Sequence, residues 1–233
     1  MGISQSASSV HKREPEGEIP FTVSGAGKQC ATWYKVIGDL NNSSLTPLIA
    51  AHGGPGATHL YLKPLEDLYK YYGVPVIFYD QLGCGRSTHL PEKKGDETFW
   101  TPALFVHELD NLVDYFGLRK RGFDFLGHSW GGYLGVEYAV RSSTGLRKLI
   151  LSDTPSSSPL MDRGVNLLVN KLPESVQKAL RDADRTGEYD NDAYKEACMV
   201  FYNQHVCRID PWPQEVVDSL TQLEEDPTVY RTM

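Results

Sequence analysis

Residues 122–135 read GFDFLGHSWGGYLG, and this segment is the clearest indication of the fold. Its first part, 122–126, is a short apolar run typical of a buried strand, and a helix is predicted over 130–141. Between them, 127–131 match the pattern Gly-x-Ser-x-Gly. A strand that runs through such a sharp turn into a helix lifts the serine hydroxyl clear of the backbone, and the glycines avoid clashes there. We therefore predict that Ser129 is a catalytic nucleophile.

A second glycine-rich segment, HGGPG at 52–56, supplies the complementary feature. In acyl-transfer enzymes with this type of turn, one N–H that stabilises the oxyanion belongs to the residue after the nucleophile, here Trp130. The other comes from a loop after an earlier strand, where glycine lets the backbone approach the substrate closely. We therefore expect an oxyanion hole made by Trp130 and by Gly53 or Gly54.

The rest of the first 155 residues continues the alternation of strands and helices. Apolar runs at 47–51 and 74–79 each end in a glycine-rich loop, as buried parallel strands do. Thr101 and Pro102 suit the start of a helix over 102–116, and a further strand is predicted at 146–151. Such alternation indicates a doubly wound, mostly parallel α/β sheet.

Beyond the linker that follows Asp153, the sequence predicts helices only. We expect them at 160–171, 174–186, 191–206 and 214–225. The predicted organisation is a disordered tail at 1–18, a partial α/β core at 19–155 and a helical cap at 156–233.

Composition narrows the classes of partner and cofactor. The chain has 233 residues and a net charge of −7, so nucleic acid is a poor candidate for a partner. No apolar run approaches the roughly 18 residues of a membrane span. The four cysteines are widely spaced without a CxxC pair, which favours reduced thiols in a cytoplasmic protein. His, Asp and Glu do not cluster in a metal-binding pattern, and we expect no metal or other cofactor.

The N-terminus matches a short acylation pattern, with Gly2 after the initiator Met and Ser6 at the hydroxyl position. N-myristoylation at Gly2 is one interpretation, and a solvated polar tail is the other. We favour the tail, because one acyl chain beside only Lys12 and Arg13 would anchor weakly.

Four motifs together resemble the proline iminopeptidase family of α/β-hydrolase serine peptidases. They are HGGPG at 52–56, DQLGCGRS at 80–87, GHSWGG at 127–132 and FYNQHVCRIDPWP at 201–213. The resemblance implies an α/β-hydrolase fold with a cap over the active site. It also implies release of an N-terminal residue, preferentially proline, from small peptides or amides through an acyl-enzyme on Ser129. The free amino terminus of the substrate would bind acidic side chains.

The residues that would activate Ser129 are harder to assign. In this fold the chain order is serine, acid, histidine, and the family's acid and histidine follow the last strands of the sheet. We expect those strands and both residues to be missing from this sequence. Asp153 and His205 have the formal order of substitutes, but His205 falls in a predicted cap helix. A sheet that ended early would expose an apolar edge, so self-association is expected.

Two other functional interpretations stay open. One is an esterase, amidase or biosynthetic hydrolase on the same scaffold, because a fold and a nucleophile do not fix the substrate. The other is a truncated fragment that lacks the catalytic acid and histidine and does not turn over substrate.

Overall fold

A six-stranded mixed sheet forms the centre of the molecule. The computed structural model describes residues 15–41, 44–141 and 143–233, so the acylation pattern at Gly2 lies outside the described residues. The strand order is β1-β2-β4-β3-β5-β6, in which β4, β3, β5 and β6 run parallel and β2 is antiparallel to both of its neighbours. The strands are β1 (Glu16–Phe21), β2 (Cys30–Ile37), β3 (Leu48–Ala51), β4 (Val76–Tyr79), β5 (Phe123–His128) and β6 (Leu146–Ser152). The predicted fold class, a doubly wound and mostly parallel α/β-hydrolase sheet, is confirmed.

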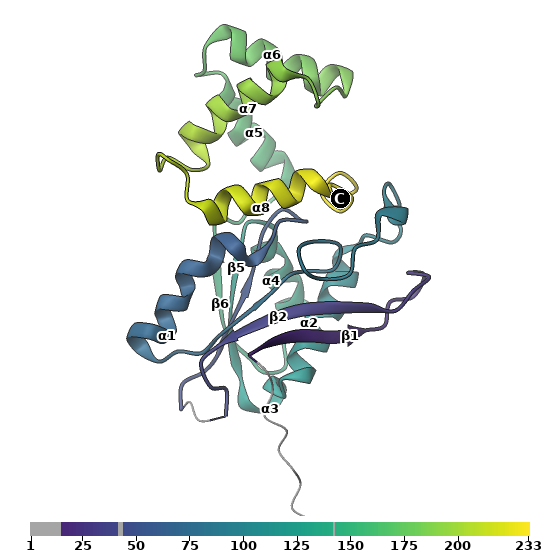
Figure 1. Cartoon of the computed structure of the whole chain (residues 1–233), viewed down its shortest axis with the longest axis vertical. Helices are drawn as coiled ribbons and strands as arrows, with labels where there is room; N and C mark the ends of the chain where they lie inside the picture. Colours follow the sequence, from purple (N-terminus) through teal and green to yellow (C-terminus); the bar gives the residue numbers. More distant parts are fainter. Residues whose placement is uncertain (1–14, 42–43, 142) are drawn as a thin grey trace, which may run out of the picture.

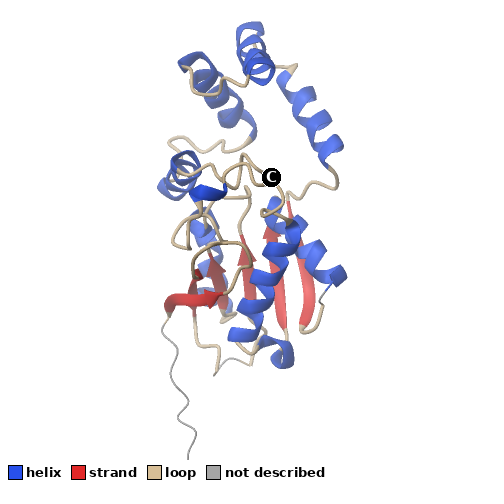
Figure 2. Cartoon of the chain, turned by 90° about the vertical axis from the view of Figure 1, so that its right-hand side faces the viewer, coloured by secondary structure: helices blue, strands red, loops and turns tan. Residues whose placement is uncertain are grey.

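Helices cover both faces of this sheet (Figures 1 and 2). The helical segments are η1 (His59–Leu65), α1 (Glu66–Tyr72), η2 (Pro91–Lys93), α2 (Pro102–Tyr115), α3 (Leu118–Arg121), α4 (Trp130–Arg141), α5 (Ser158–Val169), α6 (Glu174–Thr186), α7 (Asp192–His205) and α8 (Gln214–Glu225). Strand residues alternate between two apolar clusters because successive side chains point to opposite faces. In β4, Ile77 belongs to the large cluster with α2 and α4, while Phe78 belongs to the small one with η1 and α1.

The four helices α5–α8 stand over the carboxyl ends of the parallel strands (Figure 1). α6 packs on α7, and α8 packs on η1 of the core. After α8 the chain returns to the core, where Val229 is fully buried and lies against the positions of Gly83 and Gly56. The C-terminal residues of the expected cap segment therefore pack on the core.

The first strand begins earlier than the sequence predicted. We expected residues 1–18 to form a disordered tail, but β1 begins at Glu16. The backbone of β2 provides the reason, because Glu16 pairs with Lys35 and Glu18 pairs with Trp33 in an antiparallel register. Residues 16–18 therefore belong to the sheet, whose hydrogen bonds override their polar composition.

Candidate active site

The predicted nucleophile lies at the sharp turn between β5 and α4. Ser129 has a φ of +53°, a left-handed conformation that non-glycine residues rarely adopt. Its backbone N–H donates to Ser152 O at 2.9 Å, and its carbonyl accepts from Gly132 N at 3.0 Å to begin the helix. These two bonds fix the turn from both sides, and the serine side chain stays partly exposed.

Two glycines of the motif are required by close backbone contacts. A Cβ on Gly127 would lie 2.2 Å from Gly131 O, and a Cβ on Gly131 would lie 2.4 Å from Ala51 O at the end of β3. Any larger residue would push α4 away from the sheet. The glycines thus bring the start of α4 against the strands that carry the site.

The glycine loop (residues 52–56) lies directly against this turn. A Cβ on Gly53 would be 3.0 Å from Ser129 Cβ, so the backbone at Gly53 passes beside the nucleophile. The Gly53 N–H donates to the Tyr61 hydroxyl at 2.6 Å. By contrast, the N–H groups of Gly54 and Trp130 donate to no other residue in the described part of the chain.

A buried amide joins the glycine loop to the residue after the nucleophile. Gln81 accepts from Trp130 Nε1 at 3.0 Å and donates its amide to His52 O at 2.9 Å. The Gln81 N–H donates to His52 Nε2 at 3.0 Å, which leaves the proton on Nδ1 to donate to Gly53 O at 2.9 Å. Burial lowers the pKa of His52, in keeping with this neutral ring. The arrangement fixes the loop at its base.

Comparison with known proteins identifies the family. A model of the α/β-hydrolase fold matches residues 46–189. A proline iminopeptidase from Thermoplasma volcanium is 41% identical over 202 residues, which cover 86% of this chain and 65% of that protein. The crystal structure of proline iminopeptidase from Mycobacterium smegmatis is 38% identical with a TM-score of 0.78, covering 93% of this chain and 70% of that one. This chain belongs to the proline iminopeptidase family of α/β-hydrolases.

A second solved structure shares this similarity, and both chains are longer than the present one. The crystal structure of a protein named VinJ is 42% identical with a TM-score of 0.86, covering 94% of this chain and 70% of that one. The chain spans less than two thirds of the curated proline iminopeptidases it matches, 65% of the Thermoplasma protein and 60% of one from Lactobacillus delbrueckii subsp. lactis.

The two substitutes considered for the catalytic pair do not meet. Asp153 follows β6 and is largely exposed, and its carboxylate lies 3.8 Å from His128 Nε2. His205 is at the end of α7, where its ring packs on Phe201. In the described part of the chain, His205 forms no hydrogen bond or ion pair with Asp153. No described residue forms a hydrogen bond with the Ser129 hydroxyl. The structure therefore brings Asp153 to His128, not to His205.

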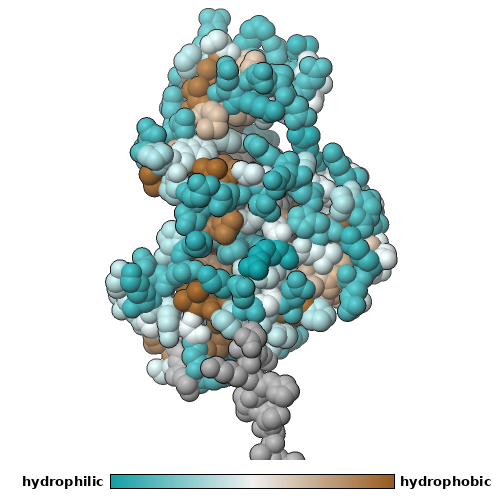
Figure 3. Space-filling model, in the orientation of Figure 1, coloured by the Kyte–Doolittle hydropathy of each residue, from teal (hydrophilic) through white to brown (hydrophobic). Residues whose placement is uncertain are grey.

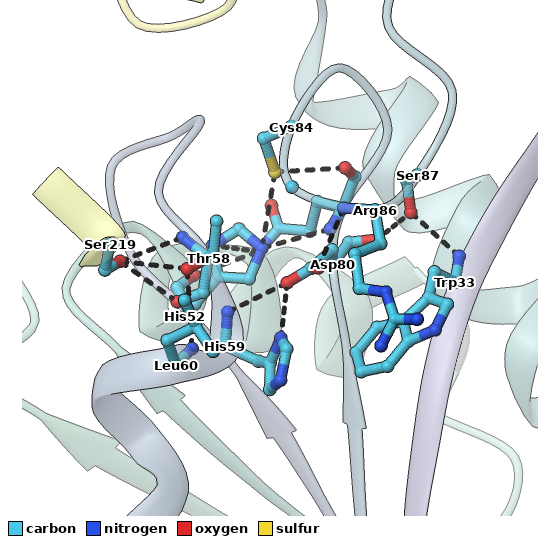
Figure 4. A network of polar contacts seen from close by, with 12 residues as sticks. Trp33, His52, Thr58, His59, Leu60, Asp80, Cys84, Arg86, Ser87 and Ser219 are labelled. Atoms are coloured by element: carbon cyan, nitrogen blue, oxygen red, sulfur yellow. Dashed lines mark hydrogen bonds and ion pairs between the residues drawn. The ribbon is translucent and has the colours of Figure 1, made fainter. Parts of the chain in front are cut away.

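A buried hydrogen bond between a histidine and an aspartate near the site was not predicted from the sequence. The Asp80 carboxylate accepts from His59 Nδ1 at 2.8 Å, from His59 N–H at 2.9 Å and from Arg86 N–H at 3.0 Å (Figure 4). Burial raises the pKa of Asp80, but the hydrogen bonds from His59 outweigh it and hold the pKa below its ordinary value. The pair joins η1 to the loop after β4. Thr58, next to His59, also bonds Ser219 of α8.

Other general features concern membranes and metals. Within residues 15–41, 44–141 and 143–233, no helix combines the length and apolar character that crossing a membrane requires. The same part of the chain holds no group of three or more His, Cys, Asp or Glu side chains arranged for a metal ion.

Proposed function

We propose that this chain carries the nucleophile and oxyanion hole of a prolyl aminopeptidase-type serine hydrolase. The substrates would be small peptides or amides with a free N-terminal proline. The observation that carries the proposal is the left-handed Ser129 turn beside the glycine loop, where the N–H groups of Gly54 and Trp130 have no acceptor among the described residues. The substrate class rests on the similarity to proline iminopeptidases at 38–41% identity.

The proposed chemistry is acyl transfer. Ser129 Oγ attacks the carbonyl carbon of the N-terminal residue, and the oxyanion accepts hydrogen bonds from Trp130 N–H and Gly54 N–H. A general base takes the Ser129 hydroxyl proton during the attack and gives it to the leaving amine as the peptide C–N bond breaks. Water hydrolyses the ester and frees Ser129. The bond between Gly53 N–H and Tyr61 supports Gly54, the second of the two predicted glycines, as the donor from the loop.

We propose that the general base lies outside these 233 residues. His128 adjoins Ser129 but directs Nδ1 to the Tyr61 hydroxyl at 2.9 Å. His205 is the last residue of α7, a helix that stands above the sheet in Figure 1. The curated relatives are also longer than this chain. Asp153 and His205 remain low-ranking substitutes for the catalytic acid and histidine.

We propose that helices α5–α8 form the cap over the substrate. They stand over the strand ends where ligands of open α/β sheets bind (Figure 1). Several apolar side chains of α5 are half exposed or more, among them Leu160, Met161 and Leu167. Figure 3 shows apolar residues at the surface of this region among mostly hydrophilic ones. Such side chains suit contacts with a proline ring.

A labelling experiment tests the nucleophile and the substrate class. In the reaction with a fluorophosphonate probe, Ser129 Oγ forms a bond to phosphorus, the P–F bond breaks, and fluoride and a proton enter the solvent. Because the proposed base lies outside the chain, we expect slow labelling at Ser129. Ser129→Ala should abolish it, and Ser156→Ala, a matched change in the exposed linker, should leave it unchanged. L-prolinamide should protect Ser129 better than L-leucinamide. Equal labelling of the Ser129→Ala variant would exclude the proposed nucleophile.

Turnover of a chromogenic proline anilide tests the source of the base. We expect little turnover by the chain alone, because no described imidazole reaches Ser129. Robust turnover that depends on both Ser129 and His205 would refute an external base and favour the internal pair. An absence of labelling together with an absence of turnover would favour a catalytically incompetent chain.

We further propose self-association through β6 and a cytoplasmic location. β6 pairs with β5 on one side only among the described strands, and Ile150 and Leu151 are 42% and 49% exposed. An open apolar strand is a template for pairing with another chain. All four cysteines are described and free, which suits the reducing cytoplasm.

A further inference from the structure

The Tyr61 hydroxyl lies between the glycine loop and the nucleophile turn. Tyr61 is on η1, and its oxygen accepts from Gly53 N–H at 2.6 Å. The same oxygen lies 2.9 Å from His128 Nδ1, on the residue immediately before Ser129. The rings of Tyr61 and His128 meet edge to face, with centroids 5.2 Å apart. One phenol therefore contacts both backbone segments that border the nucleophile.

The number of protons that each group can donate fixes the direction of the Gly53–Tyr61 and Tyr61–His128 hydrogen bonds. A phenol has one proton to donate, and Gly53 N–H can only donate to it. The Tyr61 O–H is then free to donate to His128 Nδ1, provided that this nitrogen carries no proton. Burial lowers the pKa of His128, which favours the neutral ring, and burial raises the pKa of Tyr61, which keeps its proton. The remaining His128 proton sits on Nε2, towards Asp153 at 3.8 Å.

We propose that Tyr61 is a positioning residue, whose hydroxyl holds the glycine loop against the Ser129 turn and leaves Gly54 N–H as the loop's donor to the substrate oxyanion. Without this bridge, Gly53 N–H would compete for the oxyanion or for water. Only the Gln81 side chain, which contacts His52 O and Trp130 Nε1, would then link the loop to the turn among the described residues. An oxyanion hole works because its donors are held in place before the reaction. The catalytic part of this inference rests on the proposed function of Ser129.

Two tyrosine variants make a matched comparison. Tyr61→Phe removes the bridging oxygen and keeps the ring against His128. Tyr79→Phe makes the same change in β4, where the buried hydroxyl has no hydrogen-bond partner among the described residues. Both variants are expected to fold, and Tyr79→Phe should be neutral because no bond is lost.

The first readout is independent of catalysis. In the wild-type chain, the Gly53 amide proton should exchange slowly with solvent, and the His128 ring should show an unprotonated Nδ1 in nitrogen NMR spectra. In Tyr61→Phe we expect the Gly53 amide to exchange about tenfold faster, relative to amides of β3 and β5, because a protecting bond of about 1.4 kcal/mol is lost. The His128 ring signals should move as well. Unchanged exchange and ring signals in Tyr61→Phe would overturn the bridge.

The second readout is the rate at which the fluorophosphonate labels Ser129. We expect about a tenfold lower second-order rate constant in Tyr61→Phe, below the 10²–10³-fold cost of losing an oxyanion donor outright. Tyr79→Phe should stay within about twofold of wild type. Equal rates in Tyr61→Phe and wild type would overturn the positioning role. Failure of the wild-type chain to be labelled would overturn the proposed function and the catalytic role of Tyr61 with it, while the exchange data would still decide whether the bridge exists.

Discussion

Two non-glycine residues with left-handed backbones lie side by side at the site. Ser129 follows β5 with a φ of +53°, and Asp153 follows the neighbouring β6 with a φ of +48°. They are linked because Ser129 N–H donates to Ser152 O, immediately before Asp153. Such conformations cost about 1–3 kcal/mol each and persist only where the surroundings impose them. At Ser129, the strain is the consequence of directing a hydroxyl away from the sheet.

The strain at Ser129 predicts an unusual order of stability. Ser129→Gly should be about 1 kcal/mol more stable to unfolding than Ser129→Ala, because glycine adopts a positive φ without the Cβ clash. Within a helix the order reverses, and Ala179→Gly on α6 should destabilise the chain by about 1 kcal/mol. Urea denaturation of the three variants measures both differences. A Ser129→Ala variant as stable as Ser129→Gly would show that the turn is not strained.

The sequence predicted the sharp turn at Ser129 but not the residues that surround it. Ser129 stands in a local pattern whose glycines report backbone geometry directly. Tyr61 reaches His128 across 67 residues, and His59 reaches Asp80 across 21, without any pattern that joins them. Such contacts depend on how η1 packs over the strand ends, which a single sequence does not encode locally. The choice between Gly53 and Gly54 likewise depended on where the Tyr61 hydroxyl lies.

Among the elements, α2 is joined to the sheet by a buried carboxyl group. Glu108 accepts from Thr32 Oγ1 of β2 at 2.5 Å and from Leu82 N–H, after β4, at 2.8 Å. Burial raises the pKa of Glu108 from its ordinary 4.5 to about 7, although these hydrogen bonds act in the opposite direction. The folded chain therefore keeps this proton up to a higher pH than the unfolded chain does.

This carboxyl group predicts how stability depends on pH. An acid with a raised folded pKa stabilises the fold below its unfolded pKa, and that contribution is lost as pH rises towards the folded pKa. Between pH 4.5 and 7, the free energy of unfolding should fall by about 3 kcal/mol more in wild type than in Glu108→Gln. Glutamine keeps an acceptor for Thr32 but does not titrate. Urea denaturation at fixed salt measures the two curves, and parallel curves would contradict the raised pKa.

The helices with an apolar stripe between clear end signals were predicted, and one segment without such a stripe was missed. The helix expected at 102–116 is α2, where Thr101 accepts from Leu104 N–H and Pro102 occupies the first turn. The helices expected at 174–186 and 214–225 are α6 and α8. The segment 59–72 was not predicted as helical. Thr58 caps its start and Gly73 ends it, but it contains Pro64 and its α1 portion buries no residue, so no apolar stripe marked it.

At the scale of the whole molecule, the sheet has two different edges. β1, at one edge, carries glutamates at positions 16 and 18 and a proline at position 20, residues that discourage pairing with another strand. β6, at the other edge among the described strands, reads LRKLILS and ends in a short apolar run. Its unpaired N–H and C=O groups lie beside Ile150 and Leu151, which are about half exposed. Pairing of two chains is therefore expected at β6 and not at β1.

A charge at this edge should prevent the pairing. We expect the sedimentation coefficient of the wild-type chain to rise with concentration, and Ile150→Lys to weaken association about tenfold or more, because paired strands would bury the two lysines near each other. Val206→Lys, a similar change at a comparably exposed apolar residue beyond α7, should associate like wild type. Analytical ultracentrifugation over a hundredfold range of concentration measures all three. A wild-type chain that stays monomeric over this range would show that β6 does not pair with a second chain. An Ile150→Lys variant that associates like wild type would show that the contact lies elsewhere.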